Sequence, residues 1–141
     1  MILSRAAEVA LAALPHLPHP DPRTKGRGVR EVAREAGLPA PFLAQVLKRL
    51  ARAGLLRSKR GRTGGFLLGR PASEITVADV VLALDGRDEL EAAFPPLRGP
   101  AGVLLGPVRD RAFALMRGTT LADLGSRVRS PAPASSSSCS T

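Results

Sequence analysis

The sequence is poor in aromatic residues and in cysteine. Only 3% of its 141 residues are aromatic, all four of them are phenylalanine, and Trp and Tyr are absent. Proteins that bind single-stranded RNA or DNA commonly stack bases on aromatic side chains, so this composition disfavours a stacking-based reader. The one cysteine, Cys139, excludes an intramolecular disulfide and any site that needs several thiolates from one chain.

Long apolar runs are missing as well. No stretch approaches the roughly 18 residues that a membrane span requires, so we expect no membrane partner. Residues 1–15 lack the layout of a secretory signal, because Glu8 interrupts the apolar stretch and no convincing cleavage site follows. The sequence therefore predicts a cytoplasmic protein, and its 44% hydrophobic residues can supply the core of one ordinary domain.

The chain has a large net positive charge, and all of this excess comes from its first half. Residues 1–70 contain fourteen Lys and Arg against four Asp and Glu, a net charge of +10, whereas residues 71–141 contain seven and eight, a net charge of −1. A domain this basic attracts polyanions and gains affinity by releasing their counterions, which points to nucleic acid. A solvated basic surface without a partner is the alternative.

Apolar spacing, capping residues and Gly/Pro breaks predict a mainly α-helical chain with a small two-stranded β wing. The short strands are expected over Leu55–Lys59 and Phe66–Gly69. The predicted helices are Ser4–Leu14, Val29–Ala36, Leu38–Ala53, Thr76–Leu84 (ended by Gly86) and Pro107–Arg117 (extended backwards by Leu105), with a last turn over Leu121–Leu124.

The second and third helices fit the contact logic of a helix-turn-helix. Small Ala33 stands where two steeply crossing helices must touch, and Gly37 can take the positive φ that the turn requires. Leu43 and Val46 then anchor the second helix to the first. An ordinary helical hairpin is the alternative, but the wing and the charge asymmetry favour a winged helix-turn-helix that binds duplex DNA.

Two groups of residues are candidates for DNA contact. The second helix would enter the major groove by its N-terminal part, where Gln45 could read adenine and its basic residues could meet guanine or phosphate. Pure phosphate contact or a solvated face is the alternative for the basic residues. The helix candidates are Ala40, Gln45, Lys48 and Arg49, and the wing candidates are Ser58, Lys59, Arg60, Gly61 and Arg62.

The predicted helices and wing strands, in this order along the chain, resemble those of the Rrf-type winged helix-turn-helix transcriptional regulators. This group includes IscR, NsrR and CymR. The resemblance covers about residues 2–124, and its most specific piece is the wing RSKRGRTGGFLLGRP followed by EITVADVVLALDG. It implies a homodimer on a partly palindromic operator, with a C-terminal dimerisation helix. Leu105, Val108, Ala112 and Leu115 would then pack across the two-fold axis, the alternative being core packing within one chain.

The resemblance also implies domain boundaries, and it shows that this sequence lacks cysteines that many members of the family have. We expect a DNA-binding domain over 1–86, a linker and dimerisation helix over 87–125, and a disordered Ser/Pro-rich tail over 126–141. Many relatives hold an iron–sulfur cluster through three cysteines ahead of the dimer helix. Residues 90–110 contain no cysteine here, and Gly106 stands where the third would be, so we predict no cluster and no other cofactor.

Other chemistry has weak support. His16, His19 and Asp21 could be proposed as a metal site, but the surrounding prolines make an extended segment that does not gather ligands, so no metal is expected. No Ser/His/acid or paired-carboxylate arrangement can be identified, so we expect no enzyme. The sequence predicts a homodimeric, sequence-specific repressor that responds, if at all, to a small-molecule or protein effector. A protein-interaction module and a non-specific nucleoid-type DNA binder are the alternatives.

Overall fold

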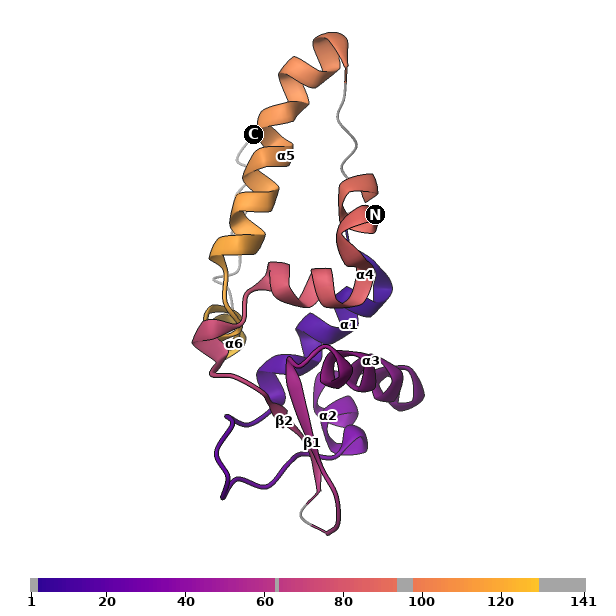
Figure 1. Cartoon of the computed structure of the whole chain (residues 1–141), viewed down its shortest axis with the longest axis vertical. Coiled ribbons are helices and arrows are strands. Elements are labelled where there is room, and N and C mark those ends of the chain that lie inside the picture. Colours follow the sequence, from indigo (N-terminus) through magenta and orange to yellow (C-terminus); the bar gives the residue numbers. More distant parts are fainter. Residues whose placement is uncertain (1–2, 63, 94–97, 130–141) are drawn as a thin grey trace, which may run out of the picture.

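A computed structural model describes residues 3–62, 64–93 and 98–129 of the chain. A compact group of helices carries a β ribbon at one end, and a long helix projects from the other end (Figure 1). The elements are α1 (Arg5–Ala13), η1 (Leu14–His16), α2 (Val29–Ala36), α3 (Ala40–Arg52), β1 (Leu56–Lys59), β2 (Gly65–Leu68), η2 (Ala72–Glu74), α4 (Val77–Ala93), α5 (Gly99–Gly118) and α6 (Leu121–Arg129).

The helix-turn-helix forms as its residues predict. Gly37 ends α2 in the left-handed region with φ 68°, and the amide of Leu38 donates to the carbonyl oxygen of Ala33 at 2.8 Å. Ala33 is only 4% exposed, and α2 and α3 pack against each other, as the helix-turn-helix requires. The apolar stripe of α3 faces inward, and all of its members are at most 1% exposed: Leu43, Val46, Leu47 and Leu50.

The wing is an antiparallel pair of strands, with Leu56 opposite Leu68 and Lys59 opposite Gly65. A third segment joins it, because Arg27 forms an isolated bridge to Phe66. The amide of Arg27 donates to the Phe66 carbonyl oxygen at 2.9 Å, and the amide of Phe66 donates back at 2.8 Å. The loop that precedes α2 is therefore fixed to the wing by backbone pairing.

The fourth predicted helix starts as expected and continues further. Thr76 and Asp79 form a capping box, in which Thr76 Oγ1 accepts from the Asp79 amide at 3.1 Å and Asp79 Oδ2 accepts from the Thr76 amide at 3.0 Å. The prediction that Gly86 ends this helix was only half right. Gly86 breaks the regular path with φ 76° and ψ 171°, and a second helical leg then runs to Ala93.

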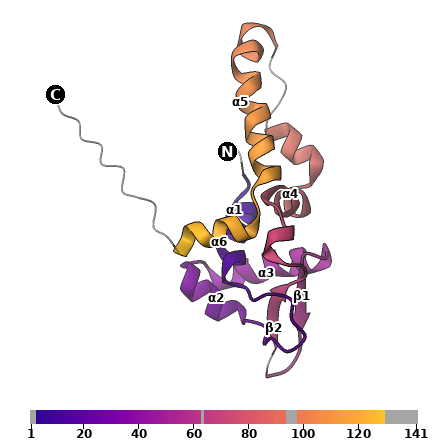
Figure 2. The same ribbon diagram turned by 90° about the vertical axis from the view of Figure 1, so that its left-hand side faces the viewer.

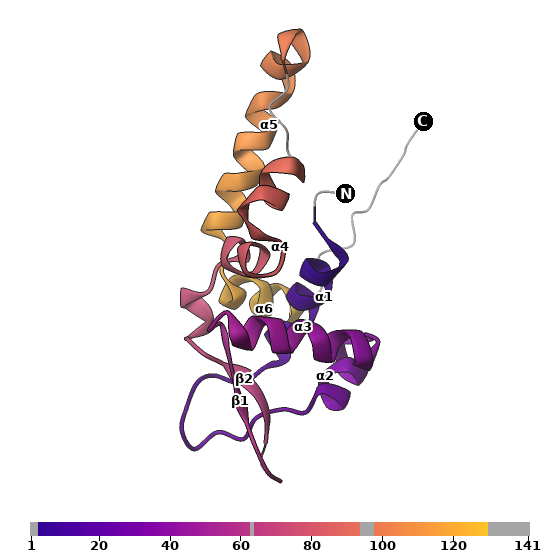
Figure 3. The ribbon, with the colours of Figure 1, turned by 45° about the vertical axis from the view of Figure 1, so that its right-hand side comes forward.

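Helix α5 begins at Gly99, eight residues before Pro107 and six before Leu105, to which the sequence prediction extends the helix. The Gly- and Pro-rich composition of residues 99–107 reads as loop, but Pro100 occupies the first turn, where a missing N–H costs nothing. Pro107 lies inside the helix, where it removes one backbone hydrogen bond. Figure 3 shows α5 rising beside α4 and away from α2 and α3.

The chain then returns to the first half. Thr120 forms a β bridge to Thr76, and Leu121, 2% exposed, joins the core built by α1, α3 and α4. Helix α6 lies at the foot of α5, in contact with η1 and η2 (Figure 2). A Thr120–Asp123 capping box starts it, and it runs to Arg129, into the segment from residue 126 on that the sequence predicts as the tail. The rest of the predicted tail, with Cys139, lies outside the described residues.

Within the described ranges, no helix combines the length and apolar character needed to cross a membrane.

Candidate nucleic-acid interface

Helix α3 presents a polar face on the side opposite its buried stripe. Gln45 and Lys48 lie one turn apart and are exposed, and neither makes a polar side-chain contact to the described residues. Ala40 stands at the N-terminal end of the same helix and is half-buried against the core. These three residues are therefore placed as a reading surface requires, with the helix N-terminus free of acidic side chains.

Arg49 is placed differently from its neighbours. Its guanidinium donates from Nη2 to the carbonyl oxygen of Leu84, near the end of the first leg of α4. The contact engages one of its donors and ties α3 to α4. The structure thus gives Arg49 a bracing contact that the sequence does not suggest.

Lys59 also makes internal contacts. Its Nζ donates to the carbonyl oxygens of Pro22 at 3.0 Å and Thr24 at 2.7 Å, both in the loop before α2. The contact holds β1 against that loop, so Lys59 stabilises the position of the wing. Its charge nevertheless stays in the wing and contributes to the local positive potential.

The tip of the wing carries the remaining candidates. Ser58, Arg60 and Arg62 are exposed, and Figure 1 shows the tip projecting from the end of the molecule opposite α5. Gly61 has φ 94°, and the amide of Gly64 donates to the Gly61 carbonyl oxygen at 2.9 Å. A tight glycine turn therefore presents two arginines to solvent, a geometry suited to phosphate or minor-groove contact.

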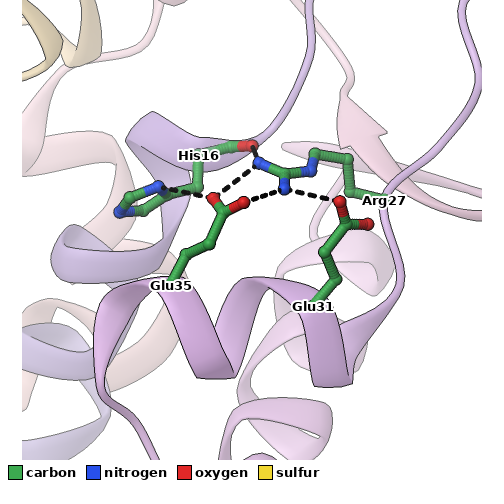
Figure 4. A network of polar contacts seen from close by, with 4 residues as sticks. All are labelled: His16, Arg27, Glu31 and Glu35. Atoms are coloured by element: carbon green, nitrogen blue, oxygen red, sulfur yellow. Dashed lines mark hydrogen bonds and ion pairs between the residues drawn. The ribbon is translucent and has the colours of Figure 1, made fainter.

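A polar network joins the wing to the helix-turn-helix (Figure 4). The Arg27 guanidinium donates to Glu35 at 2.5 and 2.9 Å, to Glu31 at 2.7 Å and to the His16 carbonyl oxygen at 3.0 Å. His16 Nδ1 lies 3.3 Å from Glu35 Oε2. Because the Arg27 backbone pairs with Phe66, this side chain fixes the wing to α2.

The network shifts the pKa values of its members. The hydrogen bonds that Arg27 donates to Glu35 and, to a smaller extent, to Glu31 raise the pKa of Arg27, and the bond from Arg27 lowers the pKa of Glu35 below its usual 4.5. Sequence reasoning did not find these contacts. Two glutamates spaced i, i+4 on a helix of a strongly basic half were the available indication, since such a pair needs a cation to offset its repulsion.

We expect Glu35→Gln to lower the free energy of unfolding at pH 7. In acid, the variant and the parent protein should be equally stable. A carboxyl whose pKa is lowered by folding stabilises the fold above its unfolded pKa, and this contribution disappears as the pH falls through the folded value. The gap between the two urea unfolding curves should therefore close below about pH 4.5. A gap of constant size from pH 7 to about pH 3 would show that Glu35 does not act through its charge.

The metal candidates do not assemble. Across residues 3–62, 64–93 and 98–129, no group of three or more His, Cys, Asp or Glu side chains is arranged to hold a metal ion. His16 contacts Glu35 instead, and Asp21 Oδ1 accepts from the amide of Arg23 at 2.8 Å.

Helix α5 exposes large apolar side chains. Val108 is 62% exposed, Leu115 56% and Leu105 45%, and Ala112 is half-buried. Val108 and Leu115 are seven residues apart and share one face, whereas Arg109, Phe113 and Met116 line the side toward α4. An apolar stripe of this size on the surface is typical of an interaction site.

Comparisons with known proteins agree with this architecture. The family model Rrf2, described as iron-dependent transcriptional regulator, matches residues 3–127. One relative is a Mycobacterium tuberculosis protein whose name assigns it provisionally to the HTH-type transcriptional regulators. It is 34% identical to this chain, and the match covers 88% of this chain and 81% of the relative. The HTH-type transcriptional regulator IscR of Photorhabdus laumondii is 44% identical over 55 residues, 39% of this chain and 34% of its own. The solved structure of CymR, the global cysteine regulator of B. subtilis, superposes with a TM-score of 0.72 at 27% identity, covering 88% of this chain and 95% of that chain.

The iron chemistry in the family description does not fit the residues present. An iron–sulfur cluster is held mainly by cysteine thiolates. This sequence has one cysteine, at position 139, and none between residues 87 and 129.

The match over residues 3–127, the helix-turn-helix with its wing, and the likeness to CymR lead to one conclusion. The chain belongs to the Rrf2 family of DNA-binding transcriptional regulators.

Proposed function

We propose that this protein binds specific sequences in duplex DNA as a homodimer and represses transcription without an iron–sulfur cluster. The observation that carries the proposal is the exposed polar face of α3 beside an arginine-tipped wing, both in the half with net charge +10. Gln45 and Lys48 read bases in the major groove, with Ala40 close to the DNA backbone. The adjoining DNA strand is contacted by the wing residues Ser58, Arg60, Gly61 and Arg62. Arg49 and Lys59 add charge while holding the reading helix and the wing in place.

The exposed apolar stripe of α5 supports dimerisation. Leu105, Val108 and Leu115 are 45% to 62% exposed, and a second copy of α5 would cover them along with Ala112. A two-fold dimer presents two reading helices to two half-sites, which accounts for a partly palindromic operator. We propose that it acts in the cytoplasm, where a bacterial transcriptional regulator can bind chromosomal DNA.

The double substitution Arg60→Ala with Arg62→Ala tests the role of the wing. We expect the affinity for duplex DNA to fall about tenfold at moderate salt, and the slope of log K against log salt to shrink by about 1 for each phosphate that the variant no longer binds. Fluorescence anisotropy with a labelled duplex at several salt concentrations measures both quantities.

Arg98→Ala with Arg111→Ala is the matched control. Both arginines are exposed on or next to α5, so the net charge falls by the same amount far from the wing. The control should keep most of the affinity and the salt slope. Equal losses in the two double variants would mean that overall charge, rather than the wing, supplies the binding, as for a non-specific nucleoid-type binder. No effect of either would favour a protein-interaction module.

A further inference from the structure

A cleft of about 310 Å³ lies between α4 and α5, away from the DNA-binding surface. Its apolar wall is formed by Ala78 and Leu82 from α4 and by Phe113 and Met116 from α5. The charged residues among its described lining are Arg87, Arg109, Arg117 and Glu91. A concave, largely apolar site with a few convergent charged groups is the usual form of a small-molecule site.

Arg109 is the central charged group of this cleft. Its guanidinium carbon lies 5.3 Å from the centroid of the Phe113 ring, so the cation stacks on an aromatic wall. Its Nε is buried, and among the residues that the structure describes this nitrogen is left without a hydrogen-bond acceptor. A buried donor of a charged group without a partner is costly, and an anionic ligand would satisfy it.

The balance of charge around the cleft also favours an anion. Three arginines and Glu91 line the cleft, and none of these arginines forms an ion pair with a carboxylate whose side chain the structure describes. Two arginines of α5 and one of α4 therefore supply positive charge to the cleft. We propose that this cleft binds a small organic anion with a flat apolar body, whose carboxylate is held by Arg109 and its neighbours.

Neighbouring residues of α4 and one hydrogen bond connect the cleft to α3, the helix proposed to read bases. Arg87 follows Gly86, the point at which α4 bends, and Leu84 on the other side of the bend accepts the hydrogen bond from Arg49 of α3. An anion that bridges Arg87 and Arg109 would fix the angle of this bend, and with it the position of α5 relative to α3. This coupling rests on the proposed DNA-binding function, whereas ligand binding itself does not.

Calorimetry on the full chain without DNA tests the site. The probes are benzoate, which combines a carboxylate with a flat ring, and benzyl alcohol, which has a similar shape without the charge. We expect saturable benzoate binding in the millimolar range or tighter and at least about tenfold weaker binding of benzyl alcohol. Arg109→Gln should weaken benzoate binding about tenfold or more, and Arg117→Gln should weaken it to a smaller extent.

Arg111→Gln is the matched control, because this exposed arginine is on the same helix and does not line the cleft. Thermal unfolding of each variant confirms that it folds. Absence of saturable benzoate binding, or equal weakening by Arg109→Gln and Arg111→Gln, would overturn the site. Benzoate should also change the affinity for duplex DNA in the parent protein but not in Arg109→Gln. Binding of benzoate with unchanged DNA affinity would overturn the coupling, and a failure of DNA binding itself would count only against the proposed function.

Discussion

A chain that carries Val108→Glu and Leu115→Glu is expected to be monomeric and to bind a palindromic duplex at least about 100-fold more weakly than the parent. Both side chains are more than half exposed and share one face of α5, where we propose the second subunit packs. Carboxylates in this interface would be buried without partners, and such burial costs far more than an apolar contact of this size returns. A monomer engages one half-site and loses the gain from simultaneous binding of both.

Light scattering coupled to gel filtration gives the oligomeric state, and anisotropy gives the affinity. The matched control is Val103→Glu with Ala114→Glu, which adds the same charge to exposed positions on a different face of α5. The control should remain dimeric. A dimeric Val108/Leu115 variant with full affinity would contradict the assignment of this face.

The substitution Gly65→Ala is expected to lower the free energy of unfolding by about 2–4 kcal/mol and to detach the wing. A Cβ at residue 65 would lie 2.5 Å from the backbone carbon and oxygen of Arg27, and the φ of 139° is one that side chains other than glycine rarely adopt. The two backbone hydrogen bonds between Arg27 and Phe66 would have to open. Urea unfolding measures the stability, and anisotropy shows the accompanying loss of DNA affinity.

Gly28→Ala controls for the loss of glycine flexibility in the same region. Its Cβ would meet nothing within 4 Å, and its φ is −72°, so a side chain fits without strain. We expect a change of less than about 1 kcal/mol, the cost of alanine at a helix N-cap. If the two variants were equally stable, the close backbone approach at Gly65 would not hold the wing in place.

The sequence was informative where local chemistry decides the structure. Ala33, Gly37 and the Leu43–Leu50 stripe are enough to predict the helix-turn-helix, because a small contact, a positive φ and helical spacing are properties of neighbouring residues. The Thr76–Asp79 cap is equally local. The charge asymmetry between the two halves also followed directly from the residues.

Features that depend on distant partners could not be predicted in this way. The acceptor of Arg49 is a backbone carbonyl 35 residues away, and any residue at position 84 would offer the same oxygen. The bridge between Thr76 and Thr120 brings α6 back to the first half for the same reason, because backbone pairing leaves no mark on side-chain pattern. The start of α5 was missed because Gly and Pro usually interrupt helices, although Pro100 is compatible with a first turn.

Selection of binding sites from a pool of random duplexes tests the central claim most directly. The purified full chain should enrich a partly palindromic sequence whose half-sites lie about one helical turn apart, and should bind it at least about 1,000-fold more tightly than an unrelated duplex at the same salt concentration. A pool that shows no enriched sequence, with equal affinity for every duplex, would contradict sequence-specific binding by this protein.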